Sequence, residues 1–225
     1  VVFQFVLSVI LIAGITVIYS QLNYIQNKDL GFDKKQKLVF NFHTEDSRAK
    51  MRAFAEDLRQ LTEVKAVSLS NVYLSQFVFN DYGVYLAGGN AASATDAQVI
   101  TSDENFAKTN GIKIIGGRDF QLYDSGKVLV NETLLKRVGL KAEQAPGTRL
   151  YSKFGLDPES FVEIAGVMKD FNYNSLHNDV KPLILRYDIQ RGDLSHITVS
   201  VDSKNYQSLL SKMEATWHKD VPGVP

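Results

Sequence analysis

An uninterrupted apolar run, Val1–Tyr19, is the feature that most constrains how this chain can fold. It reads VVFQFVLSVILIAGITVIY, and the first charged side chain of the sequence comes later, at Lys28. A helix of this length spans about 28 Å, which matches the hydrocarbon core of a bilayer. Its Val, Ile, Leu and Phe residues contribute roughly −4 to −8 kcal/mol to membrane insertion, enough to offset Gln4. The run therefore predicts one transmembrane helix over residues 1–19.

Two other interpretations of this run fit it less well. A secretory signal peptide has a shorter apolar core and a small-residue cleavage site, which Tyr19-Ser-Gln-Leu does not offer. A helix buried in a soluble core is also apolar, but it seldom lacks a polar face over this length. The chain starts inside the apolar run, without Met or a basic flank, and ends in Val-Pro-Gly-Val-Pro without a terminating element. We therefore expect a piece of a longer membrane protein.

Residues 20–36 predict a stalk that leads out of the membrane. Apolar residues continue at helical spacing, at Leu22 and Ile25, and no proline interrupts the join. Gly31 fits the left-handed position that commonly follows the last turn of a helix. We expect the membrane helix to run unbroken into a stalk at Gln21–Leu30 and to end at Gly31.

The two ends of the remaining chain have regular patterns. Residues 37–71 read as strand, helix and strand, with Asp46 or Ser47 as the N-cap, and residues 177–225 read as strand, strand and helix. Two amphipathic helices need a common sheet to cover, so we expect one sheet with both helices on one face. The predicted strands are 37–43, 64–70, 183–187 and 196–201, and the predicted helices are 47–61 and 203–219.

The middle of the chain, residues 72–176, is less regular, with glycine and asparagine turns between short strands and helices. We expect it to form a second, mixed α/β subdomain inserted into the first. The sequence therefore predicts an α+β protein with a transmembrane helix at 1–19, a stalk and exit segment at 20–36, and two subdomains beyond.

Composition and motifs disfavour several function classes. Twenty-five basic and 25 acidic residues leave no net charge, so a nucleic-acid partner is not expected. Cysteine is absent, which excludes disulfides, thiolate metal sites and a cysteine nucleophile. The histidines are scattered, at positions 43, 177, 196 and 218, and the sequence contains neither a nucleophile elbow nor a dinucleotide-binding fingerprint. We expect no enzyme activity, no catalytic metal and no cofactor.

The remaining candidates have structural explanations. Residues 111–118 superficially resemble a phosphate loop but lack its Gly-Lys-Ser/Thr ending. Asn131 begins a glycosylation sequon, yet a helix start explains it better. Two acidic pairs, Asp119 with Asp124 and Asp157 with Glu159, are expected on the solvated surface. Arg118, which follows two glycines, is expected to hold a carboxylate bidentately, for a structural reason rather than for a ligand.

Several phrases, taken in order, resemble one family of membrane proteins. The segment FQFVLSVILIAGITVIYSQLNYIQNKDLGFDK is similar to the membrane helix and exit segment of bacterial ABC transporter permeases of the MacB/FtsX-like class. GIKIIGGRDF, KVLVNETLLKRVGL, GTRL and IAGVMKDFNYNSLHNDVKPLIL resemble successive landmarks of the periplasmic core domain of that family. The resemblance covers essentially the whole chain. It departs from the family pattern at Ile115-Gly116, where such proteins have a large residue two positions before the glycine-arginine pair.

The resemblance implies a fold, a location and partners. The fold would be a ferredoxin-like subdomain, 37–71 with 177–225, interrupted by a second subdomain at 72–176. The soluble part would face the periplasm from the bacterial inner membrane. The lysines that follow the span, by contrast, weakly favour the cytoplasm. Partners would be a cytoplasmic ABC ATPase subunit, a permease dimer partner or second permease half, and membrane lipid.

In that family the stalk carries motion from cytoplasmic ATP hydrolysis to the periplasmic domain, a process called mechanotransmission. The resemblance assigns this role to one set of residues: Gln21, Tyr24, Ile25, Lys28, Leu30 and Gly31. Two alternatives remain, a ligand-binding sensor domain of a membrane receptor and a membrane-anchored enzyme. A buried ligand pocket would favour the sensor, and a catalytic constellation would favour the enzyme.

Overall fold

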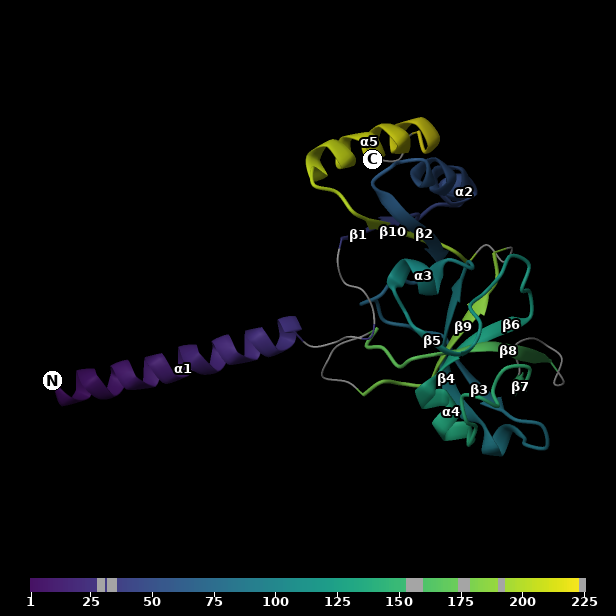
Figure 1. The fold of residues 1–225 in the computed structure, drawn as a ribbon, viewed down its shortest axis with the longest axis horizontal. Coiled ribbons are helices and arrows are strands. Elements are labelled where there is room, and N and C mark those ends of the chain that lie inside the picture. Colours follow the sequence, from purple (N-terminus) through teal and green to yellow (C-terminus); the bar gives the residue numbers. More distant parts are fainter. Residues whose placement is uncertain (28–30, 32–35, 153–159, 174–178, 190–192, 223–225) are drawn as a thin grey trace. The chain divides into compact units, whose positions relative to one another are not determined.

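The computed structural model (Figure 1) describes residues 1–27, 31, 36–152, 160–173, 179–189 and 193–222, and of residues 24–27 it describes the backbone. The chain forms two compact units, Val1–Leu30 and Gly31–Pro225. Within the described residues, the first unit is built around one helix and the second holds all the strands.

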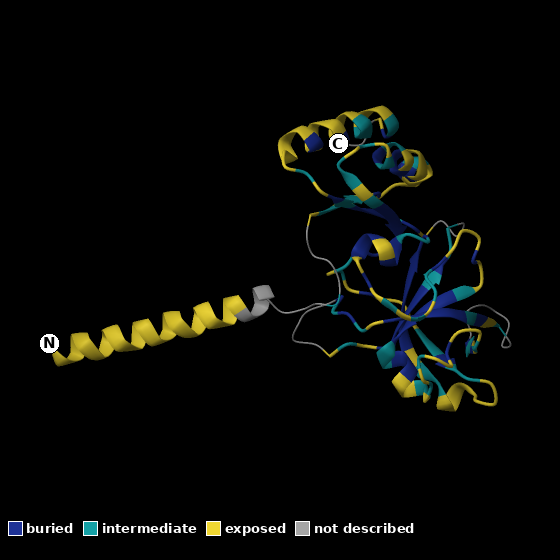
Figure 2. Cartoon of the chain, in the orientation of Figure 1, coloured by how far each residue is buried: buried dark blue, intermediate teal, exposed yellow. Residues whose placement is uncertain are grey.

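Helix α1 (Val2–Asn27) is continuous, and its segment Val2–Asn23 is long and apolar enough to cross a membrane. Its described side chains, those of residues 2–23, are all exposed (Figure 2). Such a surface is stable where lipid covers it. The prediction of an unbroken helix that passes from the apolar run into the stalk is confirmed as far as Asn27, and the last stalk residues, 28–30, lie outside the described residues.

Part of the second unit is a sheet covered by two helices. Strand β10 (His196–Val201) lies between β1 (Lys37–Asn41) and β2 (Val64–Ser70) and is antiparallel to both. β1 and β2 are therefore parallel to each other and are joined through α2 (Glu45–Arg59), which is the split β-α-β arrangement of ferredoxin-like folds. Helix α5 (Tyr206–Asp220) follows β10 and packs on the same core as α2.

The sequence of α2 explains its position. Four apolar side chains at helical spacing are buried against the sheet, those of Met51, Phe54, Ala55 and Leu58. The predicted N-cap was wrong: Thr44 caps the helix, because its Oγ1 accepts the Ser47 amide at 3.2 Å and Ser47 Oγ closes a capping box. The expected apolar face of α5 is only partly buried, since Leu209 and Met213 are covered while Leu210 is 48% exposed.

Six further strands close into a barrel. Each pairs with its neighbour in the order β4-β3-β7-β8-β6-β9, and β9 also pairs with β4, which completes the ring. Their bounds are β3 Asp81–Tyr85, β4 Thr95–Ser102, β6 Lys127–Asn131, β7 Arg149–Ser152, β8 Phe161–Met168 and β9 Leu183–Tyr187. Ser70 of β2 pairs with Ser102 of β4, which joins the barrel to the helix-covered sheet.

This topology corrects one expectation. Strand 183–187 was expected beside 37–43, 64–70 and 196–201, but as β9 it pairs with β4 in parallel and with β6 in antiparallel orientation. Both faces of β9 are apolar: Leu183 and Leu185 contact one core and Ile184 contacts another. A strand that is apolar on both faces is stable where both are covered, as in a closed barrel packed against other elements. The subdomain boundaries at 72 and 176 stay a prediction.

The barrel interior is filled with side chains. Apolar residues from its strands meet there with Leu134 and Leu135 of α4 (Glu132–Val138). On the outside, α3 (Phe106–Asn110) and β5 (Ile114–Gly117) contribute to a second core that contains Phe171 and Tyr173. A short 3₁₀ helix, η1 (Ala91–Ser93), lies between β3 and β4.

Candidate functional site

The six proposed stalk residues fall in three places. Gln21 lies in α1, and the backbone of Tyr24 and Ile25 continues the same helix. Lys28 and Leu30 lie outside the described residues. Gly31 is the first residue of the second unit, and its surroundings belong to that unit.

Gly31 packs tightly against the segment that follows β8. Its φ of +79° lies in the left-handed region, as the sequence predicted for a residue after a helix. A Cβ at this position would lie 2.6 Å from the carbonyl oxygen of Asp170 and 2.8 Å from the Cα of Phe171. Glycine is therefore required both for the backbone conformation and for the close approach.

The segment that Gly31 contacts is held by a polar network. The carboxylate of Asp170 accepts the backbone amide of Thr133 at 3.0 Å and its hydroxyl at 2.8 Å, and so caps the start of α4. In return, Glu132 Oε2 accepts the backbone amide of Asp170 at 2.9 Å. Asn131 adds a second cap, because its Oδ1 accepts the amides of Leu134 and Leu183. Gly31 is the entry point, where the chain enters the second unit. It therefore packs on a part of the barrel that these hydrogen bonds hold in place.

A second contact ties the beginning of β1 to the rest of the unit. The ammonium group of Lys37 donates to Ser200 Oγ at 2.9 Å and to the backbone carbonyl of Thr109 in α3. Lys37 also pairs with Ser200 in the register of β1 and β10. The chain thus contacts the barrel at Gly31 and the helix-covered sheet from Lys37 onward. The resemblance suggested the stalk, but no pattern in the sequence indicates the partners Asp170 and Thr109.

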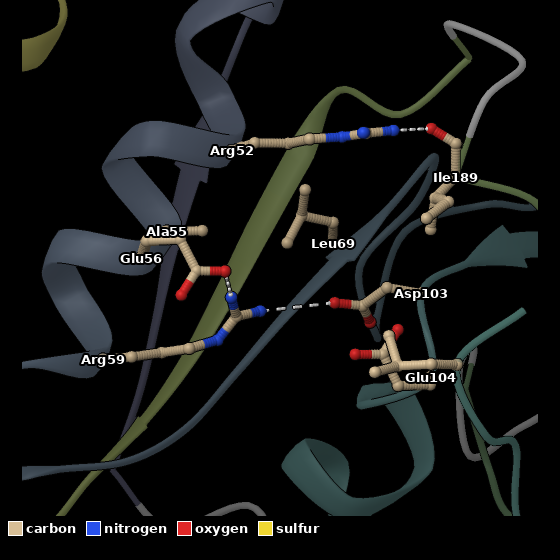
Figure 3. Close-up of a pocket in the computed structure, with 9 residues that line it drawn as sticks. Arg52, Ala55, Glu56, Arg59, Leu69, Asp103, Glu104 and Ile189 are labelled. Atoms are coloured by element: carbon tan, nitrogen blue, oxygen red, sulfur yellow. Dashed lines mark hydrogen bonds and ion pairs between the residues drawn. The ribbon is translucent and has the colours of Figure 1, made fainter.

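A hollow of about 150 Å³ lies between α2 and the loop after β4 (Figure 3). Two arginines of α2 point across it: Arg52 donates to the carbonyl of Ile189, and Arg59 Nη2 lies 3.7 Å from Asp103 Oδ2. Arg59 also contacts Glu56 of its own helix. These contacts connect the helix-covered sheet to the barrel with charged groups, which sequence reasoning missed because the partners are far apart in the chain.

Asp103 has an unusual environment for an acid. Its side chain is buried, and this burial raises the pKa of Asp103 to about 7; nearby Glu104 raises it further, while Arg59 acts in the opposite direction. The folded protein therefore holds a proton that the unfolded chain releases near pH 4. Stability should consequently fall as pH rises from about 4 to about 7.

Replacing Asp103 by Asn should remove most of this pH dependence. We expect the free energy of unfolding of the unmodified chain to drop by roughly 2–4 kcal/mol between these pH values because of this group. The D103N variant should lose that component, as measured by chemical denaturation at a series of pH values. The matched control is Asp96→Asn, an exposed acid in β4, which should keep the dependence. An unchanged profile in D103N would contradict the assignment.

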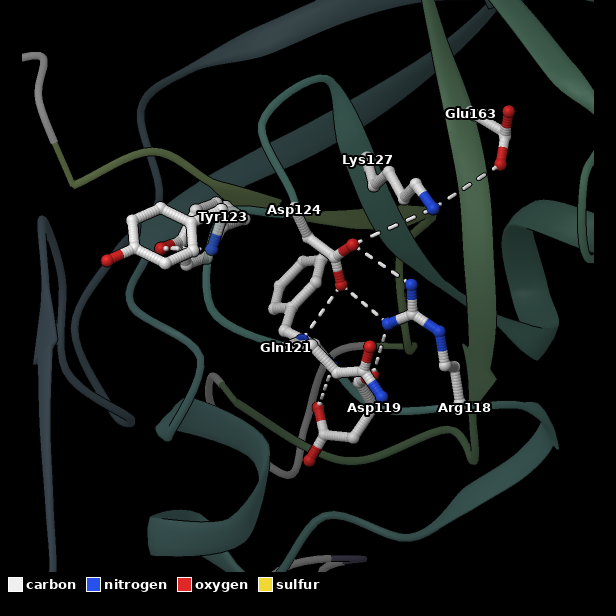
Figure 4. Close-up of polar contacts among 9 residues, drawn as sticks. Arg118, Asp119, Gln121, Tyr123, Asp124, Lys127 and Glu163 are labelled. Carbon is white, nitrogen blue, oxygen red and sulfur yellow. Dashed lines mark hydrogen bonds and ion pairs between the residues drawn. The ribbon is translucent and has the colours of Figure 1, made fainter.

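Arg118 holds a carboxylate bidentately, as predicted (Figure 4). Its Nη1 and Nη2 lie 2.5 Å and 2.9 Å from the two carboxylate oxygens of Asp124, whose Oδ2 also accepts the Gln121 amide. The Arg118 guanidinium lowers the pKa of Asp124 to about 2. The expectation of a solvated Asp124 was wrong, because this side chain is buried in the ion pair, with Lys127 at 3.6 Å. The arrangement closes a turn after β5 and serves the fold.

The other candidate residues are also explained by structure. Asn131 caps α4, as expected from the sequence. His196 is buried with Nδ1 2.9 Å from Asn41 Oδ1, and burial lowers its pKa. His43 and His218 are exposed, and His177, Asp157 and Glu159 lie outside the described residues. Among the described residues, no group of three or more His, Cys, Asp or Glu side chains could hold a metal ion.

No family model and no curated protein matches this chain, but solved structures do. The periplasmic region of MacB from Actinobacillus actinomycetemcomitans has a TM-score of 0.56 at 13% identity, covering 84% of this chain and 85% of that one. A domain of a putative permease protein from Porphyromonas gingivalis has a TM-score of 0.54 at 16% identity, covering 75% and 76%.

A third similar structure is the extracellular domain of the noncanonic ABC-type transporter YknZ from Gram-positive bacteria. Its TM-score is 0.50 at 12% identity, and the match covers 80% of this chain and 88% of that one. At such low identities a likeness establishes the fold. The α+β fold of MacB-like periplasmic domains, which the sequence resemblance implied, is therefore confirmed.

Proposed function

We propose that this chain is the extracytoplasmic domain, with its preceding membrane helix, of a bacterial ABC transporter permease of the MacB/FtsX-like class. The observation that carries the proposal is the combination of this fold, matched over most of the chain, with a membrane-length apolar helix directly before it. In this proposal the domain lies on the periplasmic side of the inner membrane. It performs no bond chemistry, and a separate cytoplasmic subunit hydrolyses ATP.

The proposed role of the stalk is mechanical. A continuous helix is stiff over the length of α1, so a displacement at its membrane end is carried to its far end. Beyond the helix, the close packing of Gly31 on Asp170 would pass the displacement to the barrel, and Lys37 would pass it to β1 and α3. These contacts support mechanotransmission through Gln21–Leu30. In this proposal the permease dimer partner or second permease half moves in the same way.

A sensor domain is the main alternative. Ligand-binding domains enclose their ligand in a cavity of several hundred Å³. In this protein the barrel interior is filled by apolar side chains such as Val99, Val128 and Ile164. That packing disfavours a ligand enclosed within the barrel.

The proposal is tested on the parent protein. Purified from its membrane in mild detergent, it should co-purify with a subunit that hydrolyses Mg-ATP. In proteoliposomes the hydrolysis rate should depend on the periplasmic domain, so deleting residues 37–221 should change the rate while leaving the assembly intact. A parent protein that assembles with no ATPase, or that has a kinase domain in the same chain, would contradict the proposal and favour the sensor.

A further inference from the structure

An exposed aromatic pair lies in the loop between β2 and β3. The side chains of Phe77 and Phe79 are 53% and 81% exposed, and their ring centroids lie 4.8 Å apart in an edge-to-face arrangement. Two phenylalanines in contact with each other and with water form an apolar patch that water solvates poorly. Such a pair is suited to contact with another apolar phase.

The pair points outward because the residue between its members points inward. Val78 is 2% exposed and belongs to the core that contains Phe171 and Tyr173. In extended backbone, neighbouring side chains alternate in direction, so a buried Val78 places both phenylalanines on the outside. Hydrogen bonds hold the loop backbone around Val78 in place. Gln98 Nε2 donates to the Val78 carbonyl at 2.9 Å, and the Val99 amide donates to the Asn80 carbonyl at 2.8 Å.

The loop rests on the same segment as the entry point of the chain. The Ser75 amide donates to the Tyr173 carbonyl at 2.9 Å, and the Tyr173 ring lies 5.6 Å from the Phe171 ring. Phe171 in turn is the residue against which Gly31 packs. The loop that carries the aromatic pair is therefore linked to Gly31, within the second unit, through Ser75, Tyr173 and Phe171.

The chain that joins the membrane-length segment to the second unit is short. Gly31 follows Asn23, the end of the membrane-length segment, by eight residues. Even a fully extended chain of that length reaches only about 28 Å. The charges nearby are mixed: Lys113 and Lys169 are exposed beside Asp170, and Asp81 is exposed beside the loop. The surface around Phe77 and Phe79 is therefore distinguished by its exposed aromatic side chains and not by its net charge.

We propose that Phe77 and Phe79 form a docking point that inserts between the lipid headgroups of the bilayer that α1 spans. Phenylalanine rings gain by leaving water for the boundary between headgroups and acyl chains. The occupant is lipid because the patch is small, apolar and attached by a short tether to a membrane helix. This inference rests on the membrane-anchored arrangement proposed above, and it gives the domain a second contact with the membrane.

The natural absence of cysteine makes a direct test possible. An Asn80→Cys variant of the full chain, spin-labelled and reconstituted in phosphatidylcholine vesicles, keeps both phenylalanines. We expect the label to be about threefold less accessible to a water-soluble nickel reagent than a label at Tyr123→Cys, and more accessible to oxygen. Tyr123 is a matched control because it is 86% exposed and also lies in a loop. Adding Phe77→Ser and Phe79→Ser to N80C should abolish the protection.

Two results would overturn the proposal. One is a label at Asn80→Cys that stays as accessible as the control, or that stays protected after both phenylalanines are replaced. The other is protection that appears only at high protein-to-lipid ratio, since it would identify a second copy of the chain as the occupant. Protection of equal size with and without 30% phosphatidylglycerol is expected, because aromatic insertion does not require anionic lipid. Failure here would leave ATPase assembly unaffected, so the two proposals are tested separately.

Discussion

Inserting a short Gly-Ser segment between Gln26 and Asn27 of the parent permease is expected to abolish transport or regulation in cells. The insertion breaks α1 near its described end, just beyond the membrane-length segment, which ends at Asn23. A Gly-Ser segment behaves as a flexible coil, so a displacement of the membrane helix would be absorbed there rather than passed to the domain. Folding of Gly31–Pro225 and assembly with the ATPase should be preserved, because that unit is compact by itself. The measurement is complementation in cells at matched protein level.

Two controls separate stiffness from mere insertion. A segment of the same length placed between Ala87 and Gly88, in an exposed turn after β3, should leave function intact. A seven-residue helical insert between Gln26 and Asn27 should preserve more function than the Gly-Ser insert, because it stays stiff and nearly keeps the rotational phase of the helix. If the Gly-Ser variant functions normally, mechanotransmission through this helix is not how the protein works, and a passive or sensory role becomes the better interpretation.

The elements that were predicted correctly have strong local signals. The apolar run predicted α1 because a helix of this length without a polar face matches the thickness of a bilayer. The spacing of Met51, Phe54 and Leu58 identified the buried face of α2, because positions i, i+3 and i+7 lie on one side of a helix. A glycine was also informative: Gly31 has the left-handed φ that its position in the sequence predicted.

The barrel was missed because its closure depends on contacts between distant segments. Strand 183–187 is apolar on both faces, and that pattern fits the centre of any sheet. Its partners are set by register with Gln98–Ser102 and Val128–Val130, about 55 to 85 residues earlier in the chain. Short-range patterns carry no information on such pairings. The partners expected for this strand were those of the helix-covered sheet, because the neighbouring strand 196–201 belongs to it. In the structure, closeness in sequence does not decide the pairing.

The residues that contact the candidate site were not predicted, for a related reason. A family resemblance could identify the stalk, but the groups that receive it are single residues in loops. Asp170 follows a strand and gives no pattern in the sequence, yet it caps α4 through Thr133. Arg59 and Asp103 are each ordinary surface types, and only the fold brings them to 3.7 Å. Polar contacts of this kind depend on tertiary structure, so they are the last features that a sequence can predict.

Replacing Gly31 by Ala is expected to destabilise the second unit strongly and to weaken coupling. The substitution meets two penalties: a left-handed φ of +79°, and a Cβ that would lie 2.6 Å from the Asp170 carbonyl oxygen. The first penalty is about 1 kcal/mol and the second adds roughly 2–3 kcal/mol, because the neighbour is backbone and cannot move aside cheaply. Chemical denaturation of the full chain in detergent measures the sum.

Gly88→Ala is the matched control, since Gly88 has a φ of +83° with no atom within 4 Å of the added Cβ. It should cost only the conformational penalty, about 1 kcal/mol. The difference between the two variants isolates the packing of the entry point on Asp170 and Phe171. Equal losses would mean that Gly31 is required only for its backbone conformation. The contact with the barrel would then be too loose to transmit force, and strand β1 would have to receive it alone.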